Sequence, residues 1–175
     1  MTAERVEAYA SALFEVARAE GALETVEDEL FKVARTFEAN EQLRSTLTDA
    51  VIPVERRLGI VEDLLGGRAA PITTALVSFV VAAGRSRELP AIIDQLVERA
   101  AADRKQVVAE VRAAIPLDAA TVERLAAALS TATGKSVSVK AVVDQSILGG
   151  VIARIGDTVL DGSIRHRLDQ LKEAI

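Results

Sequence analysis

The sequence has no cysteine, no tryptophan and one histidine, and only 3% of its 175 residues are aromatic. Without cysteine, the chain has no disulfides, thiol chemistry or cysteine-based zinc sites. A single histidine excludes a multi-histidine metal site within one chain. Few aromatic rings leave little material for stacking on nucleic-acid bases. We expect no catalytic residues, no cofactor and no bound metal.

The chain also has no excess of positive charge, because its formal net charge is −5. Phosphate backbones need a basic surface, which argues against nucleic acid as the main partner. The longest uncharged stretch, residues 69–84, contains Pro71 and is shorter than the roughly 20 residues that span a bilayer. The start of the chain shows no signal or transit peptide. We expect no direct membrane insertion and a bacterial rather than an organellar origin.

The first part of the chain predicts six helices. Apolar residues recur at helical spacing, and prolines and glycines mark most of the expected ends. The expected helices cover residues 2–20, 22–39, 41–47, 53–65, 71–83 and 90–104. Short connections between them favour a helical bundle over residues 1–105.

The pattern changes at Gln106, where apolar residues begin to alternate as in a strand. Asp118 is a candidate N-cap and Gly134 a candidate stop for one further helix. The other expected elements are strands over residues 107–114, 136–143, 151–155 and 158–160 and a last helix over 164–174. The order β-α-β-β-β-α predicts a small α/β domain over residues 106–175. The predicted fold class is therefore α+β, mostly α.

Paired glycines and three aspartates invite chemical interpretations. Gly149-Gly150 could cradle a phosphate, but no nucleotide-binding motif surrounds the pair and a strand is expected to follow. We favour a structural role, in which the glycines let a strand begin where a side chain would clash. Asp144, Asp157 and Asp161 do not match a calcium loop. We expect them to make local backbone hydrogen bonds in turns.

Apolar surface in excess is the more informative feature. One stripe of the uncharged helix holds Phe79 and Leu76, while Val77 and Val81 point elsewhere. Two interpretations stay open: the helix is buried on all sides, or its second face forms a groove beside the Tyr9–Ala12–Val16 flank of the first helix. Such a groove would receive an amphipathic helix from a partner.

The chain resembles the family of the δ subunit of F-type ATP synthase and its mitochondrial relative, the oligomycin-sensitivity-conferring protein. The resemblance covers essentially the whole length and rests on the order and spacing of several fragments. These are Tyr9-Ala10-Ser11-Ala12-Leu13-Phe14-Glu15-Val16-Ala17 with Gly21 and Leu23, Phe79 to Arg85 with Leu89-Pro90, Ile147-Leu148-Gly149-Gly150-Val151, Arg154-Ile155-Gly156-Asp157 with Val159, and Asp161-Gly162-Ser163-Ile164-Arg165 with Arg167-Leu168.

The resemblance implies a non-catalytic stator subunit, present in one copy in a hetero-oligomeric complex on the cytoplasmic side of the inner membrane. It implies that the helical domain binds N-terminal helices of the catalytic head's α subunits, and that the α/β domain contacts the b subunits of the peripheral stalk. The groove implied between the first and fifth helices falls on Tyr9, Ala12, Leu13, Val16, Leu76, Phe79 and Val80. The implied structural motif of the α/β domain comprises Asp144, Gly149, Gly150, Arg154, Gly156, Asp157, Asp161, Gly162, Ser163 and Arg165.

Three other functions match parts of the sequence. A generic helical adaptor would share the groove but not the C-terminal motifs. A nucleotide-handling enzyme would use the Gly149-Gly150 loop and would be stabilised by ATP or GTP. An RNA-binding module is disfavoured by the net charge of −5 and by the lack of aromatic residues on the expected C-terminal strands.

Overall fold

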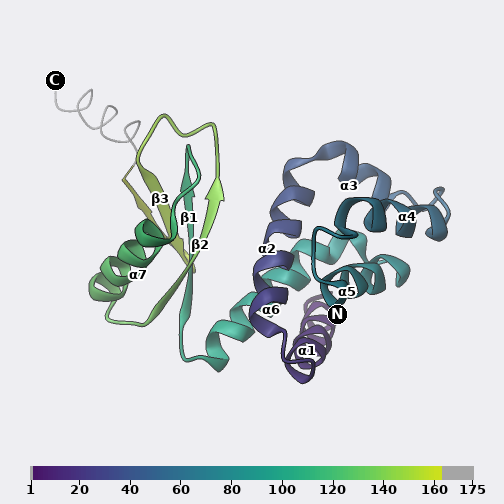
Figure 1. Cartoon of the computed structure of the whole chain (residues 1–175), viewed down its shortest axis with the longest axis horizontal. Helices are drawn as coiled ribbons and strands as arrows, with labels where there is room; N and C mark the ends of the chain where they lie inside the picture. Colours follow the sequence, from purple (N-terminus) through teal and green to yellow (C-terminus); the bar gives the residue numbers. More distant parts are fainter. Residues whose placement is uncertain (1, 163–175) are drawn as a thin grey trace. The chain divides into compact units, whose positions relative to one another are not determined.

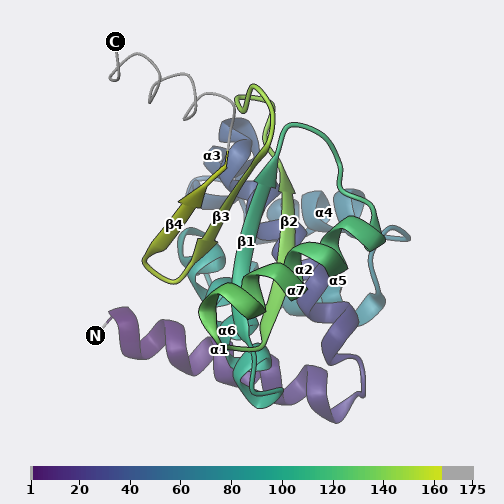
Figure 2. The same cartoon turned by 90° about the vertical axis from the view of Figure 1, so that its left-hand side faces the viewer.

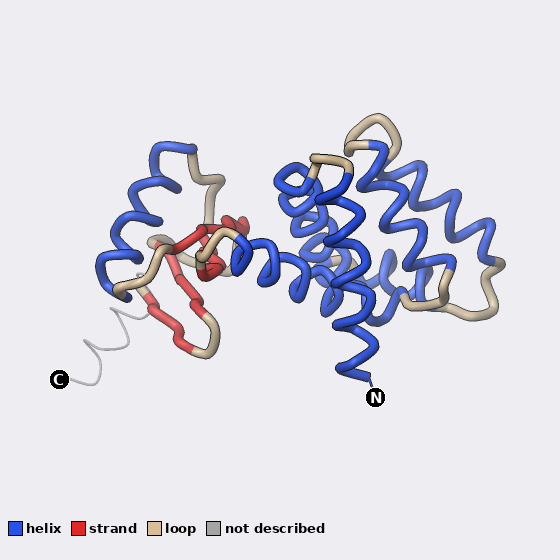
Figure 3. Tube along the Cα trace, turned by 90° about the horizontal axis from the view of Figure 1, so that it is seen from below, coloured by secondary structure: helices blue, strands red, loops and turns tan. Residues whose placement is uncertain are grey.

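A computed structural model describes residues 2–162 (Figure 1). It divides the chain into two compact units, Met1–Ala100 and Ala101–Ile175. The first unit is helical, and the second contains the strands (Figure 3). This architecture confirms the predicted fold class. The expected last helix, residues 164–174, lies outside the described residues.

Six α-helices build the first unit, as predicted. They are α1 (Thr2–Ala19), α2 (Leu23–Ala39), α3 (Glu41–Thr48), α4 (Val54–Leu65), α5 (Pro71–Ala82) and α6 (Leu89–Asp103), the last of which continues past Ala100. A 3₁₀ turn at Ser86–Glu88, which was not predicted, precedes α6.

The ends of these helices follow local chemistry. Pro71 is the first residue of α5, where its missing N–H costs no helical hydrogen bond. The side chain of Asn40 caps α3 by accepting from the backbone N–H of Leu43 at 2.9 Å. Pro53 is the N-cap of α4 rather than its first helical residue, a one-residue correction to the prediction.

The core of the first unit is mainly aliphatic, and its largest fully buried side chains come mostly from α2, α5 and α6. Fully buried side chains there are Val26 and Leu30 of α2, Val80 and Val81 of α5, and Ile92, Ile93 and Leu96 of α6. Each Å² of apolar surface that is buried contributes about 25 cal/mol, and this is the main stabilising contribution in such a core.

The second unit is a four-stranded sheet with one helix on a face. Its elements are β1 (Val107–Ala113), α7 (Ala119–Thr133), β2 (Val137–Val143), β3 (Val151–Ile155) and β4 (Thr158–Asp161). The strand order is β2-β1-β3-β4, with β1 parallel to β2 and β3 antiparallel to both β1 and β4. The parallel pair requires a crossover, which α7 supplies across one face of the sheet (Figure 2).

Predicted caps hold α7 in place. Asp118 accepts a hydrogen bond from the backbone N–H of Thr121 at 2.7 Å, and Gly134 ends the helix at φ 68°. Both expectations are confirmed. A small core then forms between α7 and the sheet; its buried members are Ala109, Val111, Leu129, Val137 and Ala153.

Candidate functional site

Burial of α5 on all sides, the first of its two interpretations, is excluded by the structure. One face is buried against the first unit's core and comprises Thr73, Thr74, Leu76, Val77, Val80 and Val81. The other face remains exposed, and Phe79 is 52% exposed there. The helix is therefore not buried on all sides. A single exposed apolar residue is normal on a protein surface, so Phe79 is informative only as part of a patch.

Phe79 meets the first helix at Tyr9. Their ring centroids lie 5.8 Å apart with the planes tilted by 40°, which is a favourable arrangement for two aromatic rings. Ala12 and Val16 follow Tyr9 at helical spacing on α1, and Val16 is 43% exposed. We name Tyr9, Ala12, Val16 and Phe79 the apolar strip.

Three residues of the expected groove are not on this surface. Leu13, Leu76 and Val80 are only 2%, 6% and 0% exposed. The helical spacing placed them beside the strip, but their side chains turn into the core of the first unit. Only the four residues of the strip therefore remain candidates for the lining of the predicted groove.

A carboxylate from α2 positions the start of α5. Glu29 accepts the backbone N–H of Ala70 at 2.9 Å and the hydroxyl of Thr73 at 2.5 Å. These donors belong to the N-terminal turn of α5, which is otherwise uncapped by a side chain. Glu29 was not predicted, because it lies 41 residues before Ala70 and carries no local capping motif.

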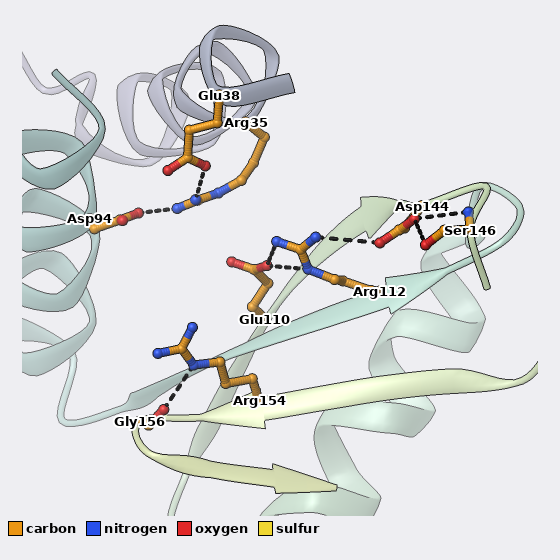
Figure 4. A network of polar contacts seen from close by, with 9 residues as sticks. All are labelled: Arg35, Glu38, Asp94, Glu110, Arg112, Asp144, Ser146, Arg154 and Gly156. Carbon is orange, nitrogen blue, oxygen red and sulfur yellow. Dashed lines mark hydrogen bonds and ion pairs between the residues drawn. The ribbon is translucent and has the colours of Figure 1, made fainter. Parts of the chain in front are cut away.

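The C-terminal motif forms a turn and a hairpin. The carboxylate of Asp144 accepts from the backbone N–H of Ser146 at 3.0 Å and from its hydroxyl at 2.6 Å. This confirms the expected local role of Asp144. Arg112 lies between two carboxylates, 2.7 Å from Glu110 and 3.4 Å from Asp144, and ties the turn to β1 (Figure 4).

Glycines of this motif occupy backbone conformations that favour glycine. Gly149 and Gly150 have φ of 145° and 76°, and β3 begins directly after them. A strand therefore follows the pair, as expected for the structural interpretation. Gly156 has φ 56° in the turn between β3 and β4, where Asp157 is its exposed neighbour.

The remaining motif residues are placed as follows. The guanidinium of Arg154 donates to the carbonyl of Gly156 at 3.1 Å (Figure 4). Asp161 pairs with Ile152 across the β3–β4 ladder, and Gly162 donates its N–H to Val151 at 2.9 Å. Ser163 and Arg165 lie outside the described residues. The contact of Arg112 was not predicted, although its spacing of two from Glu110 places both on one face of β1.

Asp144 is expected to make the turn sensitive to acid. Hydrogen bonds from the Ser146 side chain and backbone hold the pKa of the Asp144 carboxyl below its ordinary value, and Arg112 adds to this effect. A lowered native pKa stabilises the turn above the unfolded aspartate value of about 3.9, and the contribution is lost as pH falls through the native pKa.

We expect amide hydrogen exchange at residues 144–150 to become faster when the pH is lowered from 7 through the native pKa of Asp144. In Asp144→Ala, exchange in this turn is expected to be faster at pH 7 already and to show a smaller additional response to acid. Intrinsic exchange rates at each pH are divided out. Asp157→Ala, a matched change in an exposed turn, is expected to keep the wild-type response. An equal acid response in Asp144→Ala and wild type would contradict this role of the carboxylate.

Within residues 2–162, no group of three or more histidine, aspartate or glutamate side chains is arranged to hold a metal ion. Over the same range, every helix is too short or too polar to cross a membrane.

The fold defines a two-unit α+β protein with an exposed apolar strip on its helical unit. Comparison with known proteins identifies its family: the family model of the ATP synthase delta (OSCP) subunit matches residues 6–175. The chain therefore belongs to this family, which confirms the resemblance seen in the sequence.

Individual relatives agree. The chain is 43% identical over 164 residues to the ATP synthase subunit delta of Nocardia farcinica. This match covers 94% of the chain and 61% of that relative. It is 40% identical over 152 residues to the subunit delta of Streptomyces avermitilis, covering 87% of the chain and 56% of the relative. The chain thus spans less than two thirds of the length of these relatives.

Solved structures show a similar fold. A chain of the Toxoplasma gondii mitochondrial ATP synthase hexamer matches with a TM-score of 0.58 at 22% identity, covering 97% of this chain and 96% of that one. A chain of the Polytomella F-ATP synthase matches with a TM-score of 0.52 at 28% identity, covering 57% of this chain and 89% of that one.

Proposed function

We propose that this chain is a non-catalytic stator subunit of an F-type ATP synthase, which joins the crown of the catalytic head to the peripheral stalk. The observation that carries the proposal is the apolar strip of α1 and α5 in a chain of the ATP synthase delta (OSCP) family. The complex would hold this chain at the inner membrane, on the cytoplasmic side, without insertion of the chain into the bilayer.

The partner of the strip is the N-terminal helix of an α subunit. An amphipathic helix laid on the strip would bury the exposed parts of Phe79 and Val16 against its own apolar face. Each Å² of apolar surface removed from water contributes about 25 cal/mol, from which the cost of ordering the helix is subtracted. Buried aromatic residues commonly dominate such interfaces.

The second unit would hold the C-terminal end of the stalk's b subunits. In support, it exposes large apolar side chains: Val143, Leu148 and Val159 are 50%, 68% and 57% exposed. Two units that bind two parts of one complex raise the effective concentration of each contact. Slow dissociation follows, and the catalytic head is kept from turning with the central shaft while protons flow.

Calorimetric titration of the full chain into the purified catalytic head tests the proposal. We expect tight binding that is lost when the N-terminal segment of the α subunit is removed from the head. Binding that persists without this segment would contradict the role of the strip, and no binding to the intact head would contradict the stator function.

A further inference from the structure

A second apolar feature of the first unit lies away from the strip, between α2, α3 and α4. It is a pocket of about 440 Å³, within the range of small-molecule sites. Its buried walls come from Phe37, Leu47 and Val61, which are at most 3% exposed. Leu64, 41% exposed, lies at its open side. The stator function proposed above does not use this pocket.

One end of the pocket is cationic. Lys32 and Arg68 line it, both exposed, and neither side chain forms a hydrogen bond or ion pair within the described part of the chain. They share this end because Glu29, one turn before Lys32, binds the N–H of Ala70, two residues after Arg68. The Glu29 carboxylate is already occupied by Ala70 and Thr73. Two cations and one engaged anion leave this end with a net positive charge.

The opposite end is apolar. Leu43 and Leu47 of α3 line it together with Phe37, and Asn40 is the polar residue of that group. A ligand that fits both ends has an anionic head and an unbranched apolar tail. A planar polar ligand would leave the leucine-lined end unfilled, and a cation would be repelled by Lys32 and Arg68.

We propose that this pocket binds a long-chain carboxylate, with its head group at Lys32 and Arg68 and its alkyl chain along Leu64 and Leu65 to Leu43, whose side chains are accessible in the lining. The head group gains two charge-assisted contacts at the surface. The tail gains by leaving water, by a factor of about four in affinity for each fully buried methylene.

Dodecanoate, below its micelle concentration, is the probe. We expect calorimetric titration of the full chain to show saturable binding of one dodecanoate. Decanoate, shorter by two methylenes, is expected to bind up to about 15-fold more weakly. Dodecanol should bind more weakly than dodecanoate because it lacks the charge. Absence of saturable dodecanoate binding, or equal binding of dodecanol, overturns the proposal.

The double variant Lys32→Gln/Arg68→Gln tests the head-group contacts. We expect about tenfold weaker dodecanoate binding, because each exposed charge pair contributes a factor of about 1.5 to 5. The control Arg56→Gln/Lys135→Gln removes the same charge at exposed positions outside the pocket lining and should bind as wild type. Circular dichroism checks the fold of both variants. Equal affinities of the two double variants overturn the assignment of the head group.

A fluorescence measurement locates the tail without depending on those cations. The chain has no tryptophan, so Leu64→Trp introduces a single reporter at the pocket's open side. Dodecanoate brominated at its terminal carbon is expected to quench this reporter at concentrations that follow the calorimetric curve. Val16→Trp places the same reporter on the apolar strip, where no quenching is expected. Equal quenching at both positions would show general adsorption to apolar surface and would overturn the site.

Discussion

Replacing Phe79 by aspartate is expected to weaken binding of the α-subunit N-terminal helix by about 30-fold or more, with little change in the melting temperature of the free chain. The side chain is 52% exposed and its ring contacts Tyr9, so a carboxylate there meets solvent in the free protein. In the complex the same charge would be buried against an apolar helix face. A loss of 2 kcal/mol or more is typical of a central aromatic contact. Titration of the variant into the catalytic head measures the effect.

Leu76→Asp is the matched comparison, one turn earlier on the same helix. Leu76 is only 6% exposed, so a charge there enters the core of the first unit. The penalty for an unpaired buried charge is comparable with the whole stability of a domain, and we expect this variant to unfold. Circular dichroism separates the two outcomes. Wild-type affinity of a folded Phe79→Asp variant would remove the apolar strip from the interface.

The contrast between Leu76 and Phe79 shows where sequence patterns stop being informative. Their separation of three residues puts them on one side of a helix, and both were expected in the groove. No charge lies between Arg68 and Arg85 to mark the boundary between the buried and the exposed side of the helix, and its polar residues Thr73 and Thr74 lie on the buried side. Only the packing of α5 against other helices decides it.

The secondary structure was more predictable, because its signals are local. Asp118 and Gly134 mark α7, and the glycines at 149 and 150 mark the start of β3. Strand order was not available from these signals, since the pairing of β1 with β3 joins residues about 40 positions apart. Glu29 was not predictable for the same reason, because its partners are set by how the helices pack rather than by spacing along the chain.

Removing the carboxylate in Glu29→Ala is expected to destabilise the first unit by about 2–3 kcal/mol. Ala70 and the fully buried Thr73 would each lose an acceptor in the first turn of α5. For a unit of about 100 residues, the melting temperature should fall by roughly 10–20 °C. Differential scanning calorimetry of the full chain measures the shift.

Glu38→Ala is the control on the same helix. Its side chain is 43% exposed and pairs with the partly buried Arg35, which keeps Asp94 as a second partner, so we expect a loss of less than about 1 kcal/mol. Glu29→Gln keeps one oxygen as an acceptor and should fall between the two. Equal melting temperatures for Glu29→Ala and Glu38→Ala would show that the bonds to Ala70 and Thr73 do not hold α5. If the expected order is observed, a carboxylate on α2 sets the position of the helix that presents Phe79. In that case, Glu29→Ala should also weaken binding to the catalytic head at temperatures where the variant is still folded.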